Sequence, residues 1–439
     1  MIKTIAIVGR VNVGKSTLFN ALIRKDIAPT SPNPGLTRDR TYSYFIPDDK
    51  NRYLLIDTGG IIPGSKKDGI EDKVNLQVEI ALQEADLILF TVDLITGLTP
   101  VDRHIADKLR KKQKPVLLVV NKADSPGKDI QAVEFYNLGF ENMVVVSGEH
   151  RRNILGISDK IIELLPGAIE KQANEDFLKL CITGRPNVGK STLLNRIMGE
   201  ERVIVDSNPG TTRNPAKGYI ETPNNKWEIT DLAGLWRKKR NKQIEDIVSM
   251  IKARKEIDRA DACILILDLT EKLSLQDKRI AGWIVEAGNA VVVAGNKSDR
   301  IEFEEGLEEA FKRSLFKDMP FISFSPFIII SAKQEWGISN IFKELEKIMA
   351  NYNKEIPQEE LDALIRRCEA HRPPPEAANM RPVIKGLYQV DNSPPVFKIL
   401  VKHHRIDKIP GHWVNYIKNS IRKKFNFYGV PTKVVIGRN

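Results

Sequence analysis

The sequence predicts an α/β protein with two similar doubly wound domains, each with a mostly parallel sheet, followed by a smaller α+β domain. Three observations indicate this fold class. A set of four motifs occurs twice in the same order, short apolar runs alternate with longer helical patterns, and the composition changes near residue 350. At 439 residues the chain is too long for one ordinary core, so several domains are expected.

The motif set of the first half returns in the second half at an almost constant offset of 175, 175, 174 and 175 residues. The four pairs are GRVNVGKSTLFNAL at 9–22 and GRPNVGKSTLLNRI at 184–197, PGLTRD at 34–39 and PGTTRN at 209–214, DTGG at 57–60 and DLAG at 231–234, and NKAD at 121–124 and NKSD at 296–299. Four motifs in one order at one offset indicate a duplicated domain.

Apolar runs of four to six residues lie between the motifs. They are 5–8, 53–56, 87–92 and 116–120 in the first half, and 179–183, 227–230, 262–267 and 290–294 in the second. Runs of this length, rich in Val, Ile and Leu and separated by helical patterns, are typical of buried parallel strands. Ligands are then expected at the carboxyl ends of those strands.

Changes in composition predict the domain boundaries. The expected parts are a first domain at 1–165, a polar linker at 166–176, a second domain at 177–350, and a basic domain at 355–439. For the basic domain we expect a helix near 358–370, two or three strands, and a helix near 411–424.

A GxxxxGK[ST] loop follows an apolar run and precedes a helical pattern in both halves, which is the context of a true phosphate loop. Backbone N–H groups and the helix N-terminus surround the phosphates there, and the lysine reaches the β- and γ-phosphates. Taken alone, one such loop could also belong to another nucleotide-binding protein or be degenerate. The predicted phosphate-binding residues are Gly9, Asn12, Val13, Gly14, Lys15, Ser16, Thr17 and Gly60, and Gly184, Asn187, Val188, Gly189, Lys190, Ser191, Thr192 and Gly234.

Three oxygen-bearing side chains in each half are predicted to bind the Mg²⁺ that accompanies the nucleotide phosphates. They are the loop serine, the aspartate of DxxG, and a threonine that senses the γ-phosphate through the ion. These residues are Ser16, Thr37 and Asp57 in the first half, and Ser191, Thr212 and Asp231 in the second.

The NKxD motif predicts guanine as the base. Its carboxylate can accept two parallel hydrogen bonds from the N1–H and amino group of guanine, whereas adenine has no N1–H donor. The asparagine ties the base loop to the phosphate loop, and the lysine stem lies along the purine. The predicted guanine-binding residues are Asn121, Lys122, Asp124 and Ser147, and Asn296, Lys297, Asp299, Ser331, Ala332 and Lys333. Gly148 stands where the second half has Ala332. Glycine changes the freedom of the backbone but keeps the N–H group, so we expect at most a small weakening of the contact with guanine.

The residue after DxxG is apolar in both halves, Ile61 and Leu235, where many GTPases carry a water-orienting Gln. Hydrolysis must then depend on another group, such as a cation. Asn12 and Asn187, in the middle of the phosphate loops, are candidate ligands for a monovalent cation between the phosphates. The alternative, that these asparagines only rigidify the loop, is equally compatible with the sequence.

The basic domain holds 15 Lys and Arg against 8 Asp and Glu, an excess of seven within a net charge of +11. The stretches 417–427 and 401–405 interleave basic and aromatic residues, which can pair with phosphates and stack on RNA bases. The alternative is a small domain that packs against the other two and regulates them. The run RKKRNK at 237–242 is a solvated surface, a contact for an anionic partner, or a contact for acidic residues of the neighbouring domain.

The remaining features favour a cytoplasmic protein. No apolar run of about 18 residues is present, and the N-terminus lacks the pattern of a secretory signal. The three cysteines, Cys181, Cys263 and Cys368, have neither metal-site nor disulfide spacing. Membrane insertion is therefore not expected.

The two phosphate loops, PGLTRD with PGTTRN, both NKxD motifs and the basic extension resemble the EngA (Der) family of tandem-domain GTPases over essentially the whole chain. The resemblance implies a KH-like C-terminal fold, association with the 50S ribosomal subunit and its rRNA, and a role in late ribosome assembly in the bacterial cytoplasm. It also implies K⁺-assisted hydrolysis through Asn12 and Asn187. Departures from the family pattern are Val11 in the first loop, Gly148, Asn214 and Leu232. These departures do not indicate which of the two sites hydrolyses GTP faster or binds it more tightly.

The leading hypothesis is a monomeric GTPase that hydrolyses GTP to GDP and phosphate, and whose nucleotide state controls association with the large ribosomal subunit. Two alternatives are a GTP-regulated binding module with little hydrolysis and a GTPase acting in tRNA modification. Complete lysine, serine and aspartate sets in both halves argue against the module.

Overall fold

The computed structural model describes residues 2–23, 41–48, 51–61, 70–112, 114–166, 177–199, 203–205, 218–229, 242–302, 306–376, 380–403 and 409–438. The chain divides into two compact units, one formed mainly by Arg38–Gln172 and the N-terminal segment, the other mainly by Ala173–Arg237 and Ala253–Asn439. Each is described by itself. No helix in the described ranges is long and apolar enough to cross a bilayer.

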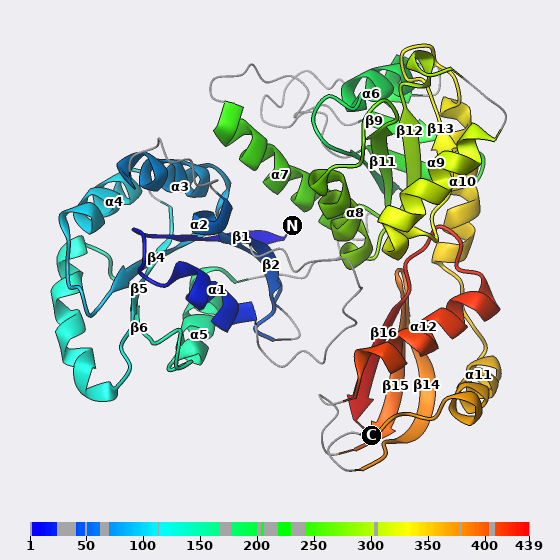
Figure 1. The fold of residues 1–439 in the computed structure, drawn as a ribbon. Coiled ribbons are helices and arrows are strands. Elements are labelled where there is room, and N and C mark those ends of the chain that lie inside the picture. The colour runs from blue at the N-terminus through cyan, green and yellow to red at the C-terminus, as the bar shows by residue number, and fades with distance from the viewer. Residues whose placement is uncertain are drawn as a thin grey trace. The chain divides into compact units, whose positions relative to one another are not determined.

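The first unit is built on a six-stranded sheet with the order β2-β3-β1-β4-β5-β6 (Figure 1). Its strands are β1 (Lys3–Val8), β2 (Tyr42–Phe45), β3 (Tyr53–Asp57), β4 (Leu87–Asp93), β5 (Val116–Asn121) and β6 (Met143–Val145). The central strands pair in parallel, and only β2 runs antiparallel to its neighbour β3.

Helices cover both faces of this sheet, as the sequence predicts for a doubly wound domain. Helices α1 and α5 pack on one face, and α3, α4 and the 3₁₀ segment η1 pack on the other (Figure 1). The helical segments are α1 (Lys15–Ile23), α2 (Thr58–Ile61), α3 (Ile70–Glu84), α4 (Pro100–Arg110), η1 (Pro126–Leu138) and α5 (Ile154–Leu164).

The second unit repeats this arrangement with a seven-stranded sheet of order β13-β12-β11-β7-β10-β9-β8. Its strands are β7 (Leu178–Thr183), β8 (Val203–Val205), β9 (Gly218–Glu221), β10 (Lys226–Ile229), β11 (Ala262–Asp268), β12 (Ala290–Asn296) and β13 (Phe327–Ile329). Its helical segments are α6 (Lys190–Gly199), α8 (Leu275–Ala287), η3 (Ser298–Arg300), α9 (Leu307–Asp318), η4 (Pro320–Ile322) and α10 (Ile338–Tyr352). Helix α7 (Lys242–Arg259) is divided between the units, with the residues up to Lys252 in the first and those from Ala253 in the second. Helices α6 and α10 share one apolar core with the sheet.

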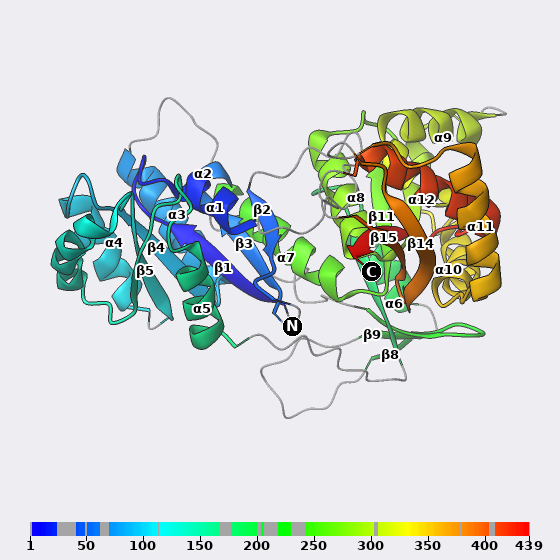
Figure 2. The same cartoon turned by 90° about the horizontal axis from the view of Figure 1, so that it is seen from below.

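The C-terminal part of the second unit is an α+β layer with its own apolar core (Figure 2). Its three strands, in the order β14-β15-β16, are β14 (Val383–Asn392), β15 (Pro395–Lys402) and β16 (Lys433–Arg438). Helices α11 (Gln358–His371) and α12 (Gly411–Phe425) pack on one face of this sheet. The helices expected near 358–370 and 411–424 are therefore confirmed, and the strands number three.

All eight predicted strands are present, and the fold class is confirmed. The strands that the apolar runs did not indicate are β2, β6, β8, β9 and β13, which lie at or next to the edges of the sheets. They have only three or four residues each, so they carry too little apolar pattern to be recognised.

Candidate nucleotide-binding sites

The phosphate loop of each half connects a central strand to a helix, β1 to α1 and β7 to α6. Gly14 has φ +89° and Gly189 has φ +103°, and a Cβ on either would lie within 2.4 Å of the Nδ2 atom of Asn121 or Asn296. These two glycines are needed both for their backbone conformation and for the close approach of the base loop.

The loop asparagines Asn12 and Asn187 have φ 65° and 66°, in the left-handed region. Asparagine enters this region more readily than most residues because its short polar side chain can bond locally. The matched conformation shows that the two loops turn in the same way at the same position.

The loop lysines are folded back over their own loops. Lys15 Nζ donates to the carbonyls of Gly9 and Arg10 at 2.8 and 2.7 Å, and Lys190 Nζ donates to those of Gly184 and Arg185 at 2.9 and 2.7 Å. Burial lowers the pKa of each ammonium to about 8; for Lys15 the nearby Asp57 works in the opposite direction. An ammonium that is partly desolvated and held by carbonyl oxygens at the phosphate loop is well suited to bind an anion.

Ser16 and Asp57 fit the binding of a magnesium ion. Ser16 Oγ donates to Asp57 Oδ2 at 2.6 Å, so a hydroxyl and a carboxylate oxygen, both of the type that Mg²⁺ prefers, lie side by side next to the phosphate loop. When bound, the ion would neutralise charge on the phosphates. In the second half Ser191 is described, but Thr212 and Asp231 lie outside the described residues, as does Thr37 of the first half.

The base loops are tied to the phosphate loops by the predicted asparagines. Asn121 Nδ2 donates to Val13 O at 2.9 Å and its Oδ1 accepts from Gly148 N at 2.9 Å. In the second half Asn296 bonds Val188 O at 2.8 Å and accepts from Ala332 N at 2.9 Å. The glycine at 148 makes the same backbone hydrogen bond as Ala332.

The carboxylates predicted to read guanine are held by the serines predicted beside them. Ser147 Oγ donates to Asp124 Oδ1 at 2.8 Å, and Ser331 Oγ donates to Asp299 Oδ1 at 2.7 Å. His150, which we did not predict, lies with Nε2 3.8 Å from Asp124 Oδ1. In each half one carboxylate oxygen is thus oriented by a serine.

Several predicted switch residues cannot be placed. The backbone of Gly60 and Ile61 forms the end of α2, and Gly60 is exposed, but the side chain of Ile61 lies outside the described part. Gly234, Leu235 and the basic run up to residue 241 lie outside it as well. Lys333 is described and exposed.

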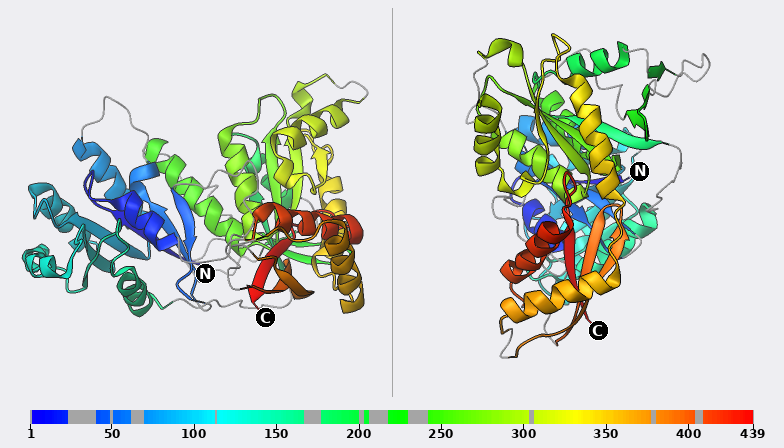
Figure 3. Two further views of the ribbon diagram at one scale, coloured as in Figure 1. Left: turned by 60° about the horizontal axis from the view of Figure 1, so that its bottom comes forward. Right: turned by 90° about the vertical axis from the view of Figure 1, so that its right-hand side faces the viewer.

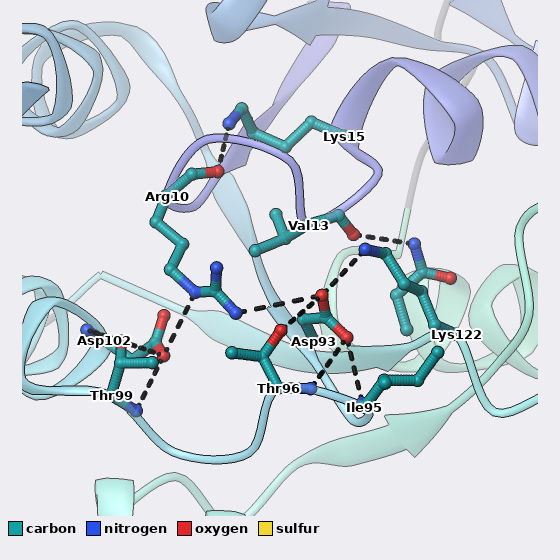
Figure 4. Close-up of polar contacts among 10 residues, drawn as sticks. Arg10, Val13, Lys15, Asp93, Ile95, Thr96, Thr99, Asp102 and Lys122 are labelled. Atoms are coloured by element: carbon teal, nitrogen blue, oxygen red, sulfur yellow. Dashed lines mark hydrogen bonds and ion pairs between the residues drawn. The ribbon is translucent and has the colours of Figure 1, made fainter.

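The sites also contain charged residues that the motifs did not indicate. Arg10 Nε lies 3.5 Å from Asp102 Oδ2, and Lys122 Nζ donates to Asp93 Oδ2 at 2.7 Å (Figure 4). Asp93 and Asp268 each end an apolar strand, and an acidic residue at the carboxyl end of such a strand was the available signal.

The basic C-terminal stretch is only partly suited to RNA. Phe425 and Phe427 are 6% and 1% exposed and belong to the core, so the expectation that they stack on bases is wrong. They lie on the apolar side of α12 and its extension. Although basic residues alternate with them in the sequence, the two rings pack into the core, as large apolar side chains usually do. Lys423 and Lys424 remain exposed.

The comparisons with known proteins agree with this architecture. A family model described as 50S ribosome-binding GTPase matches residues 4–122 and 179–297, and one described as the KH-domain-like C-terminal part of EngA bacterial GTPase enzymes matches 355–436. The elongation factor Tu GTP-binding domain model matches 249–351.

Similar proteins named GTPase Der extend over the full length. That of Finegoldia magna is 36% identical, covering 97% of both chains, and that of Clostridium acetobutylicum is 38% identical, covering 98% of both. The chain belongs to the GTPase Der family. It is therefore a GTPase, and the resemblance to the EngA (Der) family is confirmed. Family membership also implies a guanine nucleotide bound with Mg²⁺.

Among solved structures, Era of Aquifex aeolicus bound to GDP·AlF4⁻ is 22% identical with a TM-score of 0.31, covering 60% of this chain and 93% of that one. The G domain of the T. maritima FeoB iron transporter is 21% identical with a TM-score of 0.27, covering 39% and 98%.

Proposed function

We propose that this Der-family GTPase binds the large ribosomal subunit in a manner controlled by its nucleotide state, and acts in late ribosome biogenesis. The observation that carries the proposal is the combination of two nucleotide sites with a basic C-terminal domain in one chain, matched over 97% of its length by GTPase Der proteins. We further propose that the protein acts as a monomer in the cytoplasm and that it binds rRNA.

The nucleotide sites supply the switch in this proposal. Thr37, Thr212 and the two DxxG glycines contact the γ-phosphate side of GTP, and its loss releases both segments. The exposed lysines of the C-terminal domain supply phosphate contacts, since electrostatic pairing dominates RNA affinity. Neither GTPase half is assigned the faster turnover.

The test is sedimentation of the full-length protein with purified ribosomal subunits in GTP, GDP and a non-hydrolysable GTP analogue. We expect it to pellet with the large subunit to an extent that differs between nucleotides. Equal association in all three nucleotides, or none, would overturn the proposal. Measurable GTP turnover without ribosome contact would favour the tRNA-modification alternative, and binding without turnover would favour the regulated module.

We also propose that K⁺ supports hydrolysis through Asn12 and Asn187, because the positions after DxxG carry Ile61 and Leu235. Replacing Na⁺ by K⁺ should raise GTP turnover severalfold. Asn12→Gly removes the side-chain oxygen yet tolerates the φ of 65°, and it should abolish the K⁺ effect at that site. A variant that is slower by the same factor in both salts would indicate a rigidifying role instead.

A further inference from the structure

One aspartate in each half stands at a junction between the phosphate loop and the base loop. Asp93 ends β4 and lies in register beside Asn121, the first residue of NKxD. Asp268 ends β11 and lies beside Asn296 in the same way. We call Asp93 and Asp268 the linking aspartates. They are 2% and 7% exposed, respectively, although no motif required a carboxylate there.

The first linking aspartate bonds in three directions (Figure 4). Asp93 accepts from Ile95 N at 2.9 Å and from Thr96 Oγ1 at 3.0 Å, which fixes the turn after β4. It accepts from Lys122 Nζ at 2.7 Å, and its Oδ2 lies 3.8 Å from Arg10 Nη2. Asp93 therefore joins the second residue of the phosphate loop to the lysine of the base loop.

The second half repeats the arrangement. Asp268 accepts from Thr270 N at 3.0 Å and from Lys297 Nζ. Arg185 Nε lies 3.5 Å from Asp277 Oδ2, as Arg10 Nε lies from Asp102. The bond from the lysine, the turn contact and the contact between the loop arginine and a helix aspartate recur in both halves. The halves differ at the second arginine nitrogen, since Arg185 Nη2 pairs with Glu271 Oε2 at 2.6 Å, whereas Arg10 Nη2 approaches Asp93.

Charge and burial explain why the carboxylate is suited to this position. Burial alone would raise the pKa of each linking aspartate, but the hydrogen bonds from the lysine and the turn threonine outweigh it, so the pKa is lowered. The carboxylate is therefore ionised while buried. A buried charge of this kind is tolerated when it is paired and hydrogen-bonded.

The lysine that it holds is in an unfavourable backbone conformation. Lys122 and Lys297 have φ 68° and 71°, in the left-handed region that is unfavourable for a residue with a Cβ. The neighbouring asparagine is fixed by the phosphate loop, and the ammonium is fixed by the linking aspartate. Both ends of the lysine are thus restrained, which keeps its stem in one place.

We propose that Asp93 and Asp268 are positioning residues for guanine-nucleotide binding. Each holds the NKxD lysine stem against the purine face, and Asp93 also links the base loop to the phosphate loop through Arg10. The inference rests on the base assignment made above, in which Lys122 and Lys297 lie along the purine. Neither aspartate contacts the reacting phosphate, so its effect is on nucleotide retention.

The test is GDP release from the full-length chain carrying Asp93→Asn, in a background where Lys190→Ala silences the second site. Asparagine keeps an acceptor for the turn and loses the charge that pairs with Lys122 and Arg10. We expect fluorescently labelled GDP to dissociate at least tenfold faster, while kcat at saturating GTP changes less than threefold. Asp268→Asn in a Lys15→Ala background should behave alike.

Asp107→Asn is the matched control, since Asp107 pairs with Arg110 on the exposed side of α4. It should leave GDP release unchanged. If Asp93→Asn releases GDP within twofold of the parent, or lowers kcat as much as it raises KM, the positioning role is wrong. A variant that melts earlier but retains GDP normally once folded contradicts it equally.

A double-mutant cycle separates this inference from the base assignment. Lys122→Met alone should speed GDP release, and adding Asp93→Asn should then have little further effect, because both changes remove one interaction. If the double variant releases GDP faster by the product of the two single-variant factors, the aspartate does not act through the lysine. If Lys122→Met itself has no effect, the base assignment fails, whereas ribosome sedimentation tests the proposed function independently.

Discussion

At the scale of single residues, we expect the base preference to depend on one carboxylate in each site. Ser147 and Ser331 donate to Oδ1 of Asp124 and Asp299, which orients each carboxylate while both of its oxygens keep acceptor capacity for a ligand. A guanine would present two donors to this group, so a change of acceptor to donor on one side should alter which base is accepted.

Asp124→Asn and Asp299→Asn should each convert one site from guanine to xanthine nucleotides. The new amide can donate to the oxygen that xanthine carries where guanine has its amino group, and GTP affinity should fall by two orders of magnitude or more, as in other polar-specific pockets. Competition binding with GTP and XTP on each variant checks this. Unaltered GTP binding in both variants would contradict the assignment.

Residue motifs predicted much of each described site, because phosphate and guanine recognition require fixed residue types at fixed spacing. Lys15, Ser16, Asp57, Asn121 and Asp124 lie where the motifs place them. Asp93 and Arg10 were not predicted, since their role depends on strand register between β4 and β5, and a sequence does not display register.

At the scale of elements, the β9–β10 hairpin is anchored to α10 by one carboxylate. Glu346 of α10 accepts from Thr222 Oγ1 and from Asn225 Nδ2, the latter at 2.8 Å. Burial would raise the pKa of Glu346, but these hydrogen bonds prevail and lower it. A hairpin of two four-residue strands gains much of its order from such a tether.

Glu346→Gln should loosen this hairpin at neutral pH by about 0.5–1.5 kcal/mol, the usual worth of a hydrogen bond. The folded pKa lies below the ordinary carboxyl value of 4.5, so the stabilisation is complete above that value and is lost as pH falls through the folded pKa. The protection of amides 218–229 from hydrogen exchange should therefore fall as the pH is lowered through the pKa of Glu346 in the parent. In the variant this protection should not change over the same pH range.

Glu221→Gln is the matched control on the same hairpin. Glu221 pairs with Lys226 at 3.1 Å, but both side chains are more than half exposed, so the pair contributes little. Equal loosening by both substitutions would show that Glu346 has no special role in anchoring the hairpin.

The central strands could be predicted because they are buried on both faces and therefore continuously apolar, as in β11 and β12. The hairpin strand β9 (GYIE) alternates between buried and more exposed residues over only four positions. Its pairing with β10 depends on contacts with α10 that are distant in the sequence, which explains why local pattern did not reveal it.

At the scale of the second unit, the C-terminal layer contributes to the core of the nucleotide-binding part (Figure 3). Val430 is fully buried among the residues of α6, α10 and the sheet. Gly429 N donates to Phe324 O, and Val291 N donates to Gly429 O, both at 2.9 Å. The two parts have separate apolar cores, and Val430 of the C-terminal layer belongs to that of the nucleotide-binding part.

A half-buried arginine strengthens this connection. Arg422 of α12 donates from Nη1 to Val430 O and from Nη2 to Phe427 O, both at 2.8 Å, and its guanidinium lies 4.3 Å from the centre of the Phe324 ring. Burial lowers the pKa of Arg422 to about 10, so it stays charged at neutral pH. We therefore expect the C-terminal layer and the second nucleotide-binding part to unfold together.

Gly429→Ala tests this expectation in the full-length chain. The residue has φ +73°, and a Cβ would lie 2.2 Å from Ile348 Cγ1 of α10, so the substitution should cost about 1–3 kcal/mol as an overpacked, strained position. Scanning calorimetry should show one transition that contains both the C-terminal layer and the second nucleotide-binding part, lowered by about 2–4 °C per kcal/mol. The transition of the first unit should not move.

Gly199→Ala provides the comparison, because no atom lies within 4 Å of a Cβ placed there and the backbone is not left-handed. It should leave every transition where it is. If Gly429→Ala instead splits the second transition, so that the C-terminal layer melts early and β12 keeps its protection from hydrogen exchange, the two parts fold independently. The nucleotide state at the carboxyl end of β12 could then not reach the C-terminal layer through the shared core, and any control of RNA binding by that site would have to act through the switch segments alone.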